Sequence, residues 1–224
     1  MEQITNLIKN GLLRDLIITE RSFLLNKKIK DSASKLPSST TLEISKILYD
    51  LTYTELVLGL CRLFDTPNKK YPTRCIKQLY NIVEASENII QVKDRTFLFD
   101  QIQHLGVPPV YAKLLESSSS IDFNKRTVVF FEAEEMNDPI RSSIRTVKDI
   151  RDKLLAHNED IDLTSFLPYD TIETLLNHAK NVVSFFGLAY SAIVLKPFDN
   201  FYLSHDANDW TIIYTKFIKE KNGG

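Results

Sequence analysis

Apolar residues that recur every three or four positions, over stretches too long for strands, most constrain how this chain folds. In the stretch 138–158 the apolar positions are Ile140, Ile144, Val147, Ile150, Leu154 and Leu155. This spacing places them along one face of a helix. The 224 residues include only six glycines, so helix-interrupting positions are few. The sequence therefore predicts an all-α fold.

Five long helices are expected, and several carry recognisable start signals. Thr40 with Glu43 three residues later matches a capping box, and Asp170 starts another helix in the same way. Asp138 followed by proline suits the first positions of a helix. The expected long helices span residues 4–30, 40–65, 73–90, 138–158 and 170–195, with shorter helices at 95–104 and 209–221.

Residues 106–137 interrupt this pattern. They contain the breaker Gly106-Val107-Pro108-Pro109 and a serine run, and residues 127–131 suit a short strand or an extended segment. We interpret 106–137 as an irregular insertion between the third and fourth long helices. The expected architecture is an antiparallel helical bundle in a single domain, residues 1–224. Its core spans about 4–196, and a tail follows from 197 to 224.

Composition limits where the protein can act. The net charge of −1 argues against a generally basic surface, so any RNA contact must be a local patch. Cys61 and Cys75 lie in apolar helical patterns, which predicts reduced core residues of a cytosolic protein and no zinc site. The uncharged run 181–195 is short for a membrane span and predicts a buried central helix. We expect a cytoplasmic protein with no membrane contact, no metal site and no cofactor.

Four basic residues follow one side of the expected helix 138–158. Arg141, Arg145, Lys148 and Arg151 stand at spacings of four, three and three, which places them in one broad stripe. Such a stripe can be a solvated face or a surface for a phosphate backbone. A solvated face is the more usual role of such a charge run, but this stripe is almost purely positive and ends near His157, which suits a phosphate surface, so both interpretations stay open.

Arg151 and His157 together have the chemistry to cut a phosphodiester without a metal. Histidine transfers protons near neutral pH, and arginine binds phosphate oxygens through a planar fork of donors. On a regular helix, positions six apart differ by about 120° in direction and about 9 Å along the axis. Three arrangements reconcile this spacing with one site: a bent arginine, an unwound helix end, or a contact between two subunits of a dimer.

Other catalytic signatures are missing from the sequence. It has no glycine-rich phosphate loop and no Gly-x-Ser-x-Gly elbow, which argues against nucleoside triphosphate hydrolysis and acyl transfer. His178 lies in Leu176-Asn177-His178-Ala179 and is expected to face away from the apolar side of its helix.

The segment Arg151-Asp152-Lys153-Leu154-Leu155-Ala156-His157 resembles the Arg-x(4–6)-His signature of the HEPN superfamily. Residues 56–65, which end in Leu63-Phe64-Asp65, are similar to a helix of the abortive-infection U-type (AbiU-like) branch. The order of a long helix, the Leu-Phe-Asp helix, the Arg-Asp-Lys helix and a final apolar helix is also similar. The resemblance covers most of residues 10–195.

This resemblance implies a homodimeric all-α bundle with metal-independent endoribonuclease activity of the toxin or abortive-infection type. It implies that Arg151 binds phosphate and stabilises transition-state charge, that His157 transfers protons, and that Asp152 orients one of them. Relatives suggest a protein antitoxin as a partner in addition to RNA. The RNA-binding residues expected beside this site are Arg141, Arg145, Lys148, Lys153 and Asn158.

The residue after the arginine departs from the family pattern. Many active relatives have asparagine where this chain has Asp152. A carboxylate beside a phosphate repels it unless the carboxylate pairs with Lys153 or Arg151. The alternative hypothesis is therefore a non-catalytic HEPN-fold module that binds RNA, a nucleotide or a partner protein.

Overall fold

A computed structural model describes residues 2–35, 39–68, 70, 74–86, 113–116, 119–156, 167–191, 193 and 208–222. Within these ranges every regular element is helical, as the sequence predicts. None of the helices described there is both long enough and apolar enough to cross a bilayer. The elements are α1 Glu2–Leu7, η1 Ile8–Leu12, α2 Leu13–Ser32, η2 Ala33–Lys35, α3 Ser39–Phe64, α4 Ile76–Ala85, η3 Lys113–Glu116, α7 Ser120–Met136, α8 Ile140–Ala156, α9 Tyr169–Ser191 and α11 Asp209–Asn222.

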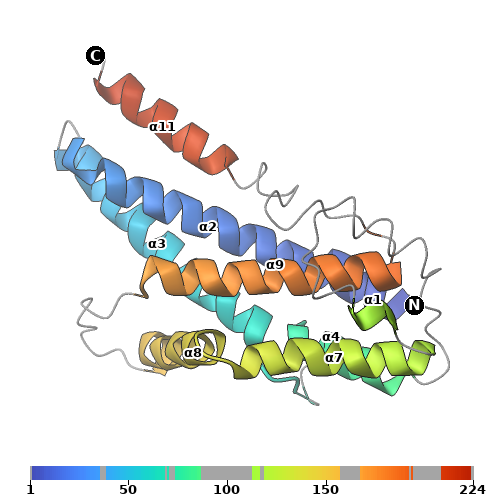
Figure 1. Ribbon diagram of the computed structural model, residues 1–224. Helices are drawn as coiled ribbons and strands as arrows, with labels where there is room; N and C mark the ends of the chain where they lie inside the picture. Colours follow the sequence, from blue (N-terminus) through green and yellow to red (C-terminus); the bar gives the residue numbers. More distant parts are fainter. Residues whose placement is uncertain are drawn as a thin grey trace.

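The helix pair α2 and α3 is the most extensive packing in the fold (Figure 1). The two helices approach closely where Gly59 of α3 meets Thr19 of α2. A Cβ atom at position 59 would lie 2.1 Å from the Thr19 hydroxyl oxygen. A glycine at this point is therefore required by the close contact between the two helices.

The N-terminal helix predicted over residues 4–30 is a continuous helical path with a change of winding inside it. Residues Ile8–Leu12 form a π-helical segment between α1 and α2, and the flanking Leu7 and Leu13 keep right-handed helical dihedrals. The Arg74 guanidinium donates to the backbone oxygen of Asn10 at 2.7 Å. Periodicity in the sequence predicts the helix but not the extra residue in its turn.

Helices α4, α7, α8 and α9 lie on the side of the α2–α3 pair that faces away from α11 (Figure 1). Helix α9 contacts α1, α2, α3, α4 and α8, so it is the central element of the fold. Helix α8 packs against α3, α7 and α9. Figure 1 shows α8 nearly end-on, so it crosses α7 and α9 instead of running antiparallel to them.

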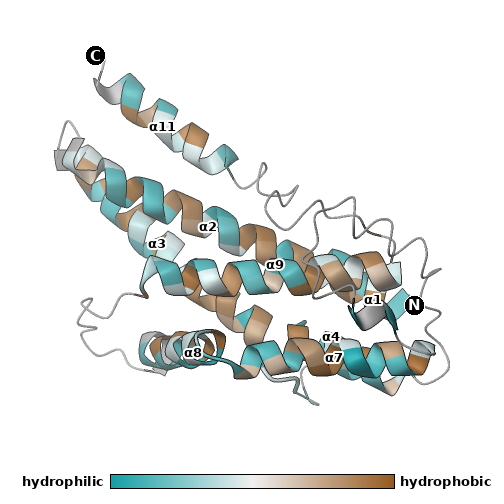
Figure 2. Cartoon of the chain, in the orientation of Figure 1, coloured by the Kyte–Doolittle hydropathy of each residue, from teal (hydrophilic) through white to brown (hydrophobic). Residues whose placement is uncertain are grey.

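Aromatic side chains fill the core around the C-terminal half of α9, which is largely hydrophobic in Figure 2. Phe186 lies 5.5 Å from Phe131 and 5.6 Å from Tyr190 between ring centroids. Phe131 also lies 5.5 Å from Phe185. Every residue from 182 to 190 is buried. The expectation of a buried central helix is confirmed over this stretch.

The interpretation of residues 106–137 as an irregular insertion is wrong for its C-terminal half. Residues Ser120–Met136 form helix α7, and residues 127–131 are part of that helix, not a strand or an extended segment. The Ser119 hydroxyl caps the helix by accepting from the Asp122 N–H at 3.1 Å. Phe123, Val128 and Phe131 are buried in the main core. Residues 106–112, 117 and 118 lie outside the described residues.

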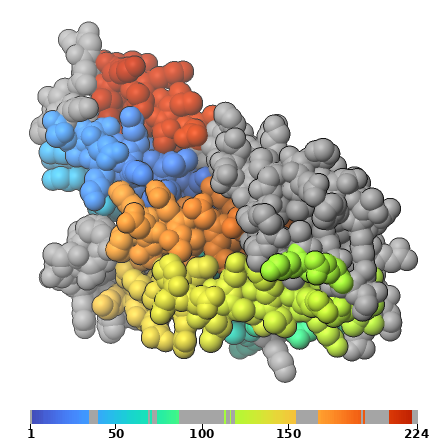
Figure 3. All heavy atoms as spheres, viewed as in Figure 1, coloured from blue at the N-terminus to red at the C-terminus, as the bar shows by residue number. Residues whose placement is uncertain are grey.

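The C-terminal helix expected at 209–221 is confirmed as α11. It packs on the ends of α2 and α3 through a second, smaller apolar cluster, which joins Leu25, Ile29, Tyr214 and Ile218. The Tyr214 hydroxyl lies 2.8 Å from the Ser45 hydroxyl, and both groups are buried. In Figure 3 the atoms of α11 lie over α2, and those of α7 and α8 form the opposite border of the described surface.

Candidate active site

Helix α8 presents Arg151 beside the C-terminal end of α3. Val147, one turn earlier, is buried, and Ile150 packs against the main core. These contacts set the rotation of α8 and leave Arg151 partly accessible, with 25 % of its side chain exposed. The predicted phosphate-binding residue is therefore held on a packed helix at the molecular surface.

Two carboxylates contact the Arg151 guanidinium. Asp152 Oδ1 accepts from Nε at 2.9 Å and also lies 2.9 Å from Nη2. Asp65 Oδ1 lies 3.7 Å from Nη1 and belongs to the residue directly after α3. The hydrogen bond to Asp152 is the largest of the contributions that raise the pKa of Arg151 above its usual value. Asp152 thus pairs with Arg151, which is the arrangement that limits its repulsion of a phosphate.

Cys61 of α3 lies near this ion pair and faces α8. Its thiol is 3.8 Å from the Val147 carbonyl oxygen, and the residue is buried. Burial raises the pKa of the Cys61 thiol to about 11, and the positive charge of Arg151 partly opposes this rise. Cys75 is also buried and forms no disulfide. The prediction that both cysteines lie in or near the core is confirmed.

We expect Cys61 to be unreactive in the folded protein. With a thiol pKa of about 11, only about one side chain in a thousand is a thiolate at pH 8. Ellman's reagent should label neither cysteine until guanidinium unfolds the chain, after which both react. Rapid labelling of one thiol in the native protein, located to Cys61 by peptide mapping, would contradict this packing.

The basic stripe continues from Arg151 back along α8. Arg141 and Arg145 of the stripe are exposed, and Lys148 is partly exposed. Lys153, two residues after Arg151, is also exposed. Within the ranges that the structure describes, none of the four forms an ion pair with a carboxylate. Asp149 is also exposed on α8 and adds a negative charge to the helix.

The structure leaves the other half of the predicted pair untested. Helix α8 is described to Ala156, and both His157 and Asn158 lie outside the described residues, as do the side chains of residues 154–156. The convergence of Arg151 and His157 stays a prediction.

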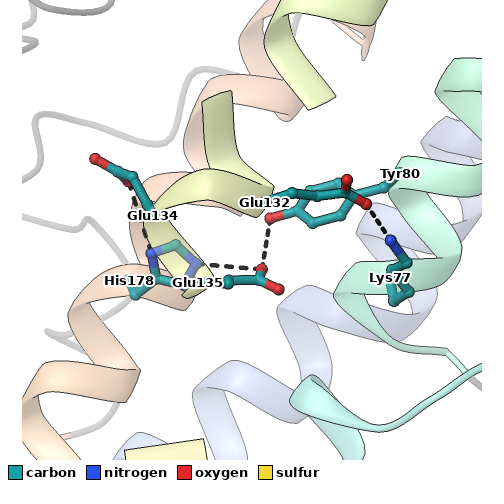
Figure 4. A network of polar contacts seen from close by, with 6 residues as sticks. All are labelled: Lys77, Tyr80, Glu132, Glu134, Glu135 and His178. Carbon is teal, nitrogen blue, oxygen red and sulfur yellow. Dashed lines mark hydrogen bonds and ion pairs between the residues drawn. The ribbon is translucent and has the colours of Figure 1, made fainter. Parts of the chain in front are cut away.

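The expectation that His178 faces away from the apolar side of its helix is wrong. The residue is buried, with 3 % of its side chain exposed, and does not face away from the core. Figure 4 shows its ring between two glutamates of α7. Its Nε2 lies 3.3 Å from Glu135 Oε1, and its Nδ1 lies 3.9 Å from Glu134 Oε2. Burial raises the pKa of Glu134, and the nearby His178 opposes that rise.

This polar network joins three helices. The Tyr80 hydroxyl of α4 donates to Glu135 Oε1 at 2.7 Å, and Lys77 pairs with Glu132 (Figure 4). Burial raises the pKa of Tyr80 well above its usual value, so the hydroxyl stays a neutral donor. Because His178 and Tyr80 are enclosed, this network holds α4, α7 and α9 together instead of contacting a substrate. Among the described residues, no group of three or more histidine, cysteine or acidic side chains is arranged to bind a metal ion.

The buried network also reaches the end of α3. The ring of Phe64 stacks on His178, with centroids 6.1 Å apart, and Phe64 immediately precedes Asp65. Asp65 is the site residue that sequence reasoning did not assign. Its place in the Leu63-Phe64-Asp65 ending was visible, but only the packing of α3 on α8 brings it to Arg151.

A comparison with protein families gives one match. The family model HEPN_AbiU2, described as AbiU2, matches residues 30–211, which include α3, α8, α9 and the Arg151 site. A search of curated proteins and a search of solved structures gave no match.

Proposed function

Because the chain belongs to the AbiU2 family of HEPN proteins, we propose that it is a metal-independent endoribonuclease of the toxin or abortive-infection type. The observation that supports this proposal most is the placement of Arg151. Its guanidinium is partly exposed, is oriented by two carboxylates and stands at the end of an exposed basic stripe. An arginine held in this way is suited to bind the phosphate of a nucleic-acid backbone.

The proposed reaction is an internal transfer at one RNA phosphate. His157 removes the proton of a ribose 2′-hydroxyl, and that oxygen attacks the neighbouring phosphorus. The bond from phosphorus to the 5′-oxygen of the next nucleotide breaks, and that oxygen takes up a proton. Arg151 stabilises the negative charge that builds on the phosphoryl oxygens. The products carry a 2′,3′-cyclic phosphate and a 5′-hydroxyl.

Asp152 is proposed to orient Arg151 in this reaction. Its Oδ1 contacts Nε and Nη2, which fixes the plane of the guanidinium relative to α8. The site is proposed to be completed in a homodimer, where the signatures of two subunits line a shared cleft. A protein antitoxin is the proposed regulatory partner.

The basic stripe, with Arg141, Arg145 and Lys148, is proposed to bind the RNA backbone on the approach to Arg151, together with Lys153 and Asn158. We expect the double variant Arg141→Ala/Arg145→Ala to weaken RNA binding and flatten its salt dependence. Each lost contact to single-stranded RNA should reduce the slope of log K against log salt by about 0.7. Fluorescence anisotropy with a fluorescein-labelled RNA of mixed sequence measures both effects.

The matched control for this experiment removes two lysines from α11. Lys216 and Lys219 are exposed there, and α11 packs on α2 and α3, not on α8. The variant Lys216→Ala/Lys219→Ala loses the same charge and should keep the wild-type salt slope. Equal slopes for the two double variants would exclude α8 as the RNA-binding face.

The experiment that tests the proposed activity is cleavage of the labelled RNA in excess EDTA. Wild-type protein should cleave it, and His157→Ala should not, while Lys216→Ala keeps full activity. Cleavage that survives in His157→Ala would assign the chemistry to another residue or another protein.

A second candidate function is supported by the charges around Arg151. Among the residues that the structure describes, the two side chains that pair with Arg151 are both carboxylates, which offset its positive charge. This favours the alternative of a HEPN-fold module that binds RNA, a nucleotide or a partner protein without cutting. RNA binding that depends on Arg141 and Arg145, with no cleavage by the dimer, would establish this alternative.

A further inference from the structure

We propose that Asp65 is a second positioning residue for Arg151, which deepens the proposed nuclease function and rests on it. Asp65 and Asp152 contact opposite parts of the same guanidinium. Asp152 contacts Nε and Nη2, and Asp65 contacts Nη1. One carboxylate comes from α8 itself and the other from the end of α3, so the two together fix the guanidinium relative to both helices.

Three features at the C-terminal end of α3 hold Asp65 in place. Its Oδ1 accepts the backbone N–H of Thr66 at 2.9 Å, which restrains its side-chain rotation. Leu63 and Phe64, which precede it, are buried in the main core. The stacking of Phe64 on His178 then ties this helix end to the network of α4, α7 and α9. Because the aspartate side chain is short and the end of α3 is packed in the core, the position of the carboxylate is restrained.

The position of Asp65 is unfavourable for the stability of α3 alone. A negative charge at the C-terminal end of a helix is repelled by the helix dipole. Asp65 nevertheless directs its carboxylate toward Arg151, and 38 % of its side chain is exposed. The nearby cation compensates for this charge, so the contact explains an aspartate where the helix itself disfavours one.

The two carboxylates also define the direction from which a phosphate reaches Arg151. Asp152 uses the edge formed by Nε and Nη2. The 3.7 Å separation between Asp65 and Nη1 is longer than a hydrogen bond, so Asp65 steers the guanidinium by charge. Within this proposal, the edge formed by Nη1 and Nη2 is the one that binds two phosphate oxygens, a geometry that suits arginine.

The test compares Asp65→Ala, Asp65→Asn and the matched control Asp149→Ala. Asp149 is an exposed aspartate two residues before Arg151, and side chains two positions apart on a helix do not face each other. We expect Asp65→Ala to lower kcat for the labelled RNA on the order of 10- to 100-fold, because the guanidinium loses its alignment. KM should change much less. Asp65→Asn removes the same charge and should lower kcat to a similar extent, whereas Asp149→Ala should keep wild-type kcat.

A second measurement does not depend on cleavage. The side-chain Nε–H resonance of Arg151, assigned by its disappearance in Arg151→Lys, reports the environment of the guanidinium in a ¹⁵N-labelled sample. We expect Asp65→Ala to shift this resonance and Asp149→Ala to leave it in place, with both variants keeping the wild-type melting temperature.

The possible results distinguish the positioning role of Asp65 from the proposed nuclease activity. If wild-type protein does not cleave RNA but Asp65→Ala shifts the Arg151 resonance, the nuclease proposal fails and the positioning contact stands. If Asp65→Ala keeps wild-type kcat, or leaves the Arg151 resonance unchanged, the positioning role of Asp65 is overturned. If Asp65→Ala does not fold, Asp65→Asn decides the question by the same two measurements.

Discussion

Replacing Phe131 with alanine should destabilise the protein by about 3–5 kcal/mol, the usual loss for a large aromatic side chain removed from a packed core. Phe131 is completely buried, and its ring lies 5.5 Å from those of both Phe185 and Phe186. The substitution removes these contacts and leaves a cavity between α7 and α9. Urea denaturation followed by circular dichroism measures the loss in the free energy of unfolding.

The control for this prediction lies two residues away on the same helix. Val129 is 62 % exposed, so Val129→Ala should change the free energy of unfolding by less than about 0.5 kcal/mol. Similar small effects for both variants would mean that α7 is not part of the core. The comparison therefore tests directly whether residues 120–136 are an integral helix or a dispensable insertion.

Arg151→Lys should lower kcat for RNA cleavage on the order of 10²- to 10³-fold, a loss typical of removing one donor that stabilises transition-state charge. Lysine keeps the positive charge but cannot contact Asp152, Asp65 and a phosphate through one planar fork. The loss should appear mainly in kcat, measured with the labelled RNA in EDTA. Arg151→Ala should lower kcat at least as much.

Two controls distinguish this effect from misfolding and from lost charge. Arg151 lies at the surface, so both variants should keep the wild-type melting temperature. Lys216→Ala removes one exposed charge on α11 and should leave kcat unchanged. Arg151→Lys with wild-type kcat would show that only the charge at this position matters and that its fork of donors has no catalytic role.

The helices were predictable where apolar periodicity is strong. In α4, Ile76, Leu79, Tyr80 and Val83 are buried at helical spacing. In α11 the same period predicts the helix, and its burial against α2 supplies the packing that stabilises it. Short amphipathic helices gain most of their stability from such packing, so a clear pattern identifies them well.

Helix α7 was missed because its composition favours a different structure. The run Thr127-Val128-Val129-Phe130-Phe131 is rich in β-branched and aromatic residues, which favour strands. Its buried positions are nevertheless helical in spacing, with Phe123, Thr127, Val128 and Phe131 inside and Val129 exposed. Tertiary packing outweighs local propensity here. In the sequence, the helical spacing of the apolar residues over 123–131 is the signal that indicates the helix.

The candidate site was predictable only in part. The sequence identified Arg151 and the basic stripe, because a helical period places their side chains on one face. It did not identify Asp65, since the contact arises from packing between helices far apart in the chain. It also misplaced His178, because the glutamates that accommodate a buried histidine come from α7, which was not predicted as a helix.

The central claim is that Arg151 and His157 form one site that cuts RNA through its own 2′-hydroxyl. The most direct test is to incubate the protein in EDTA with an RNA and with the same sequence as 2′-deoxy DNA, and to determine the product ends by mass spectrometry. The account predicts fragments ending in a 2′,3′-cyclic phosphate from RNA, intact DNA, and no cleavage by Arg151→Ala or His157→Ala. Cleavage of both substrates, or RNA fragments ending in a 3′-hydroxyl, would contradict it.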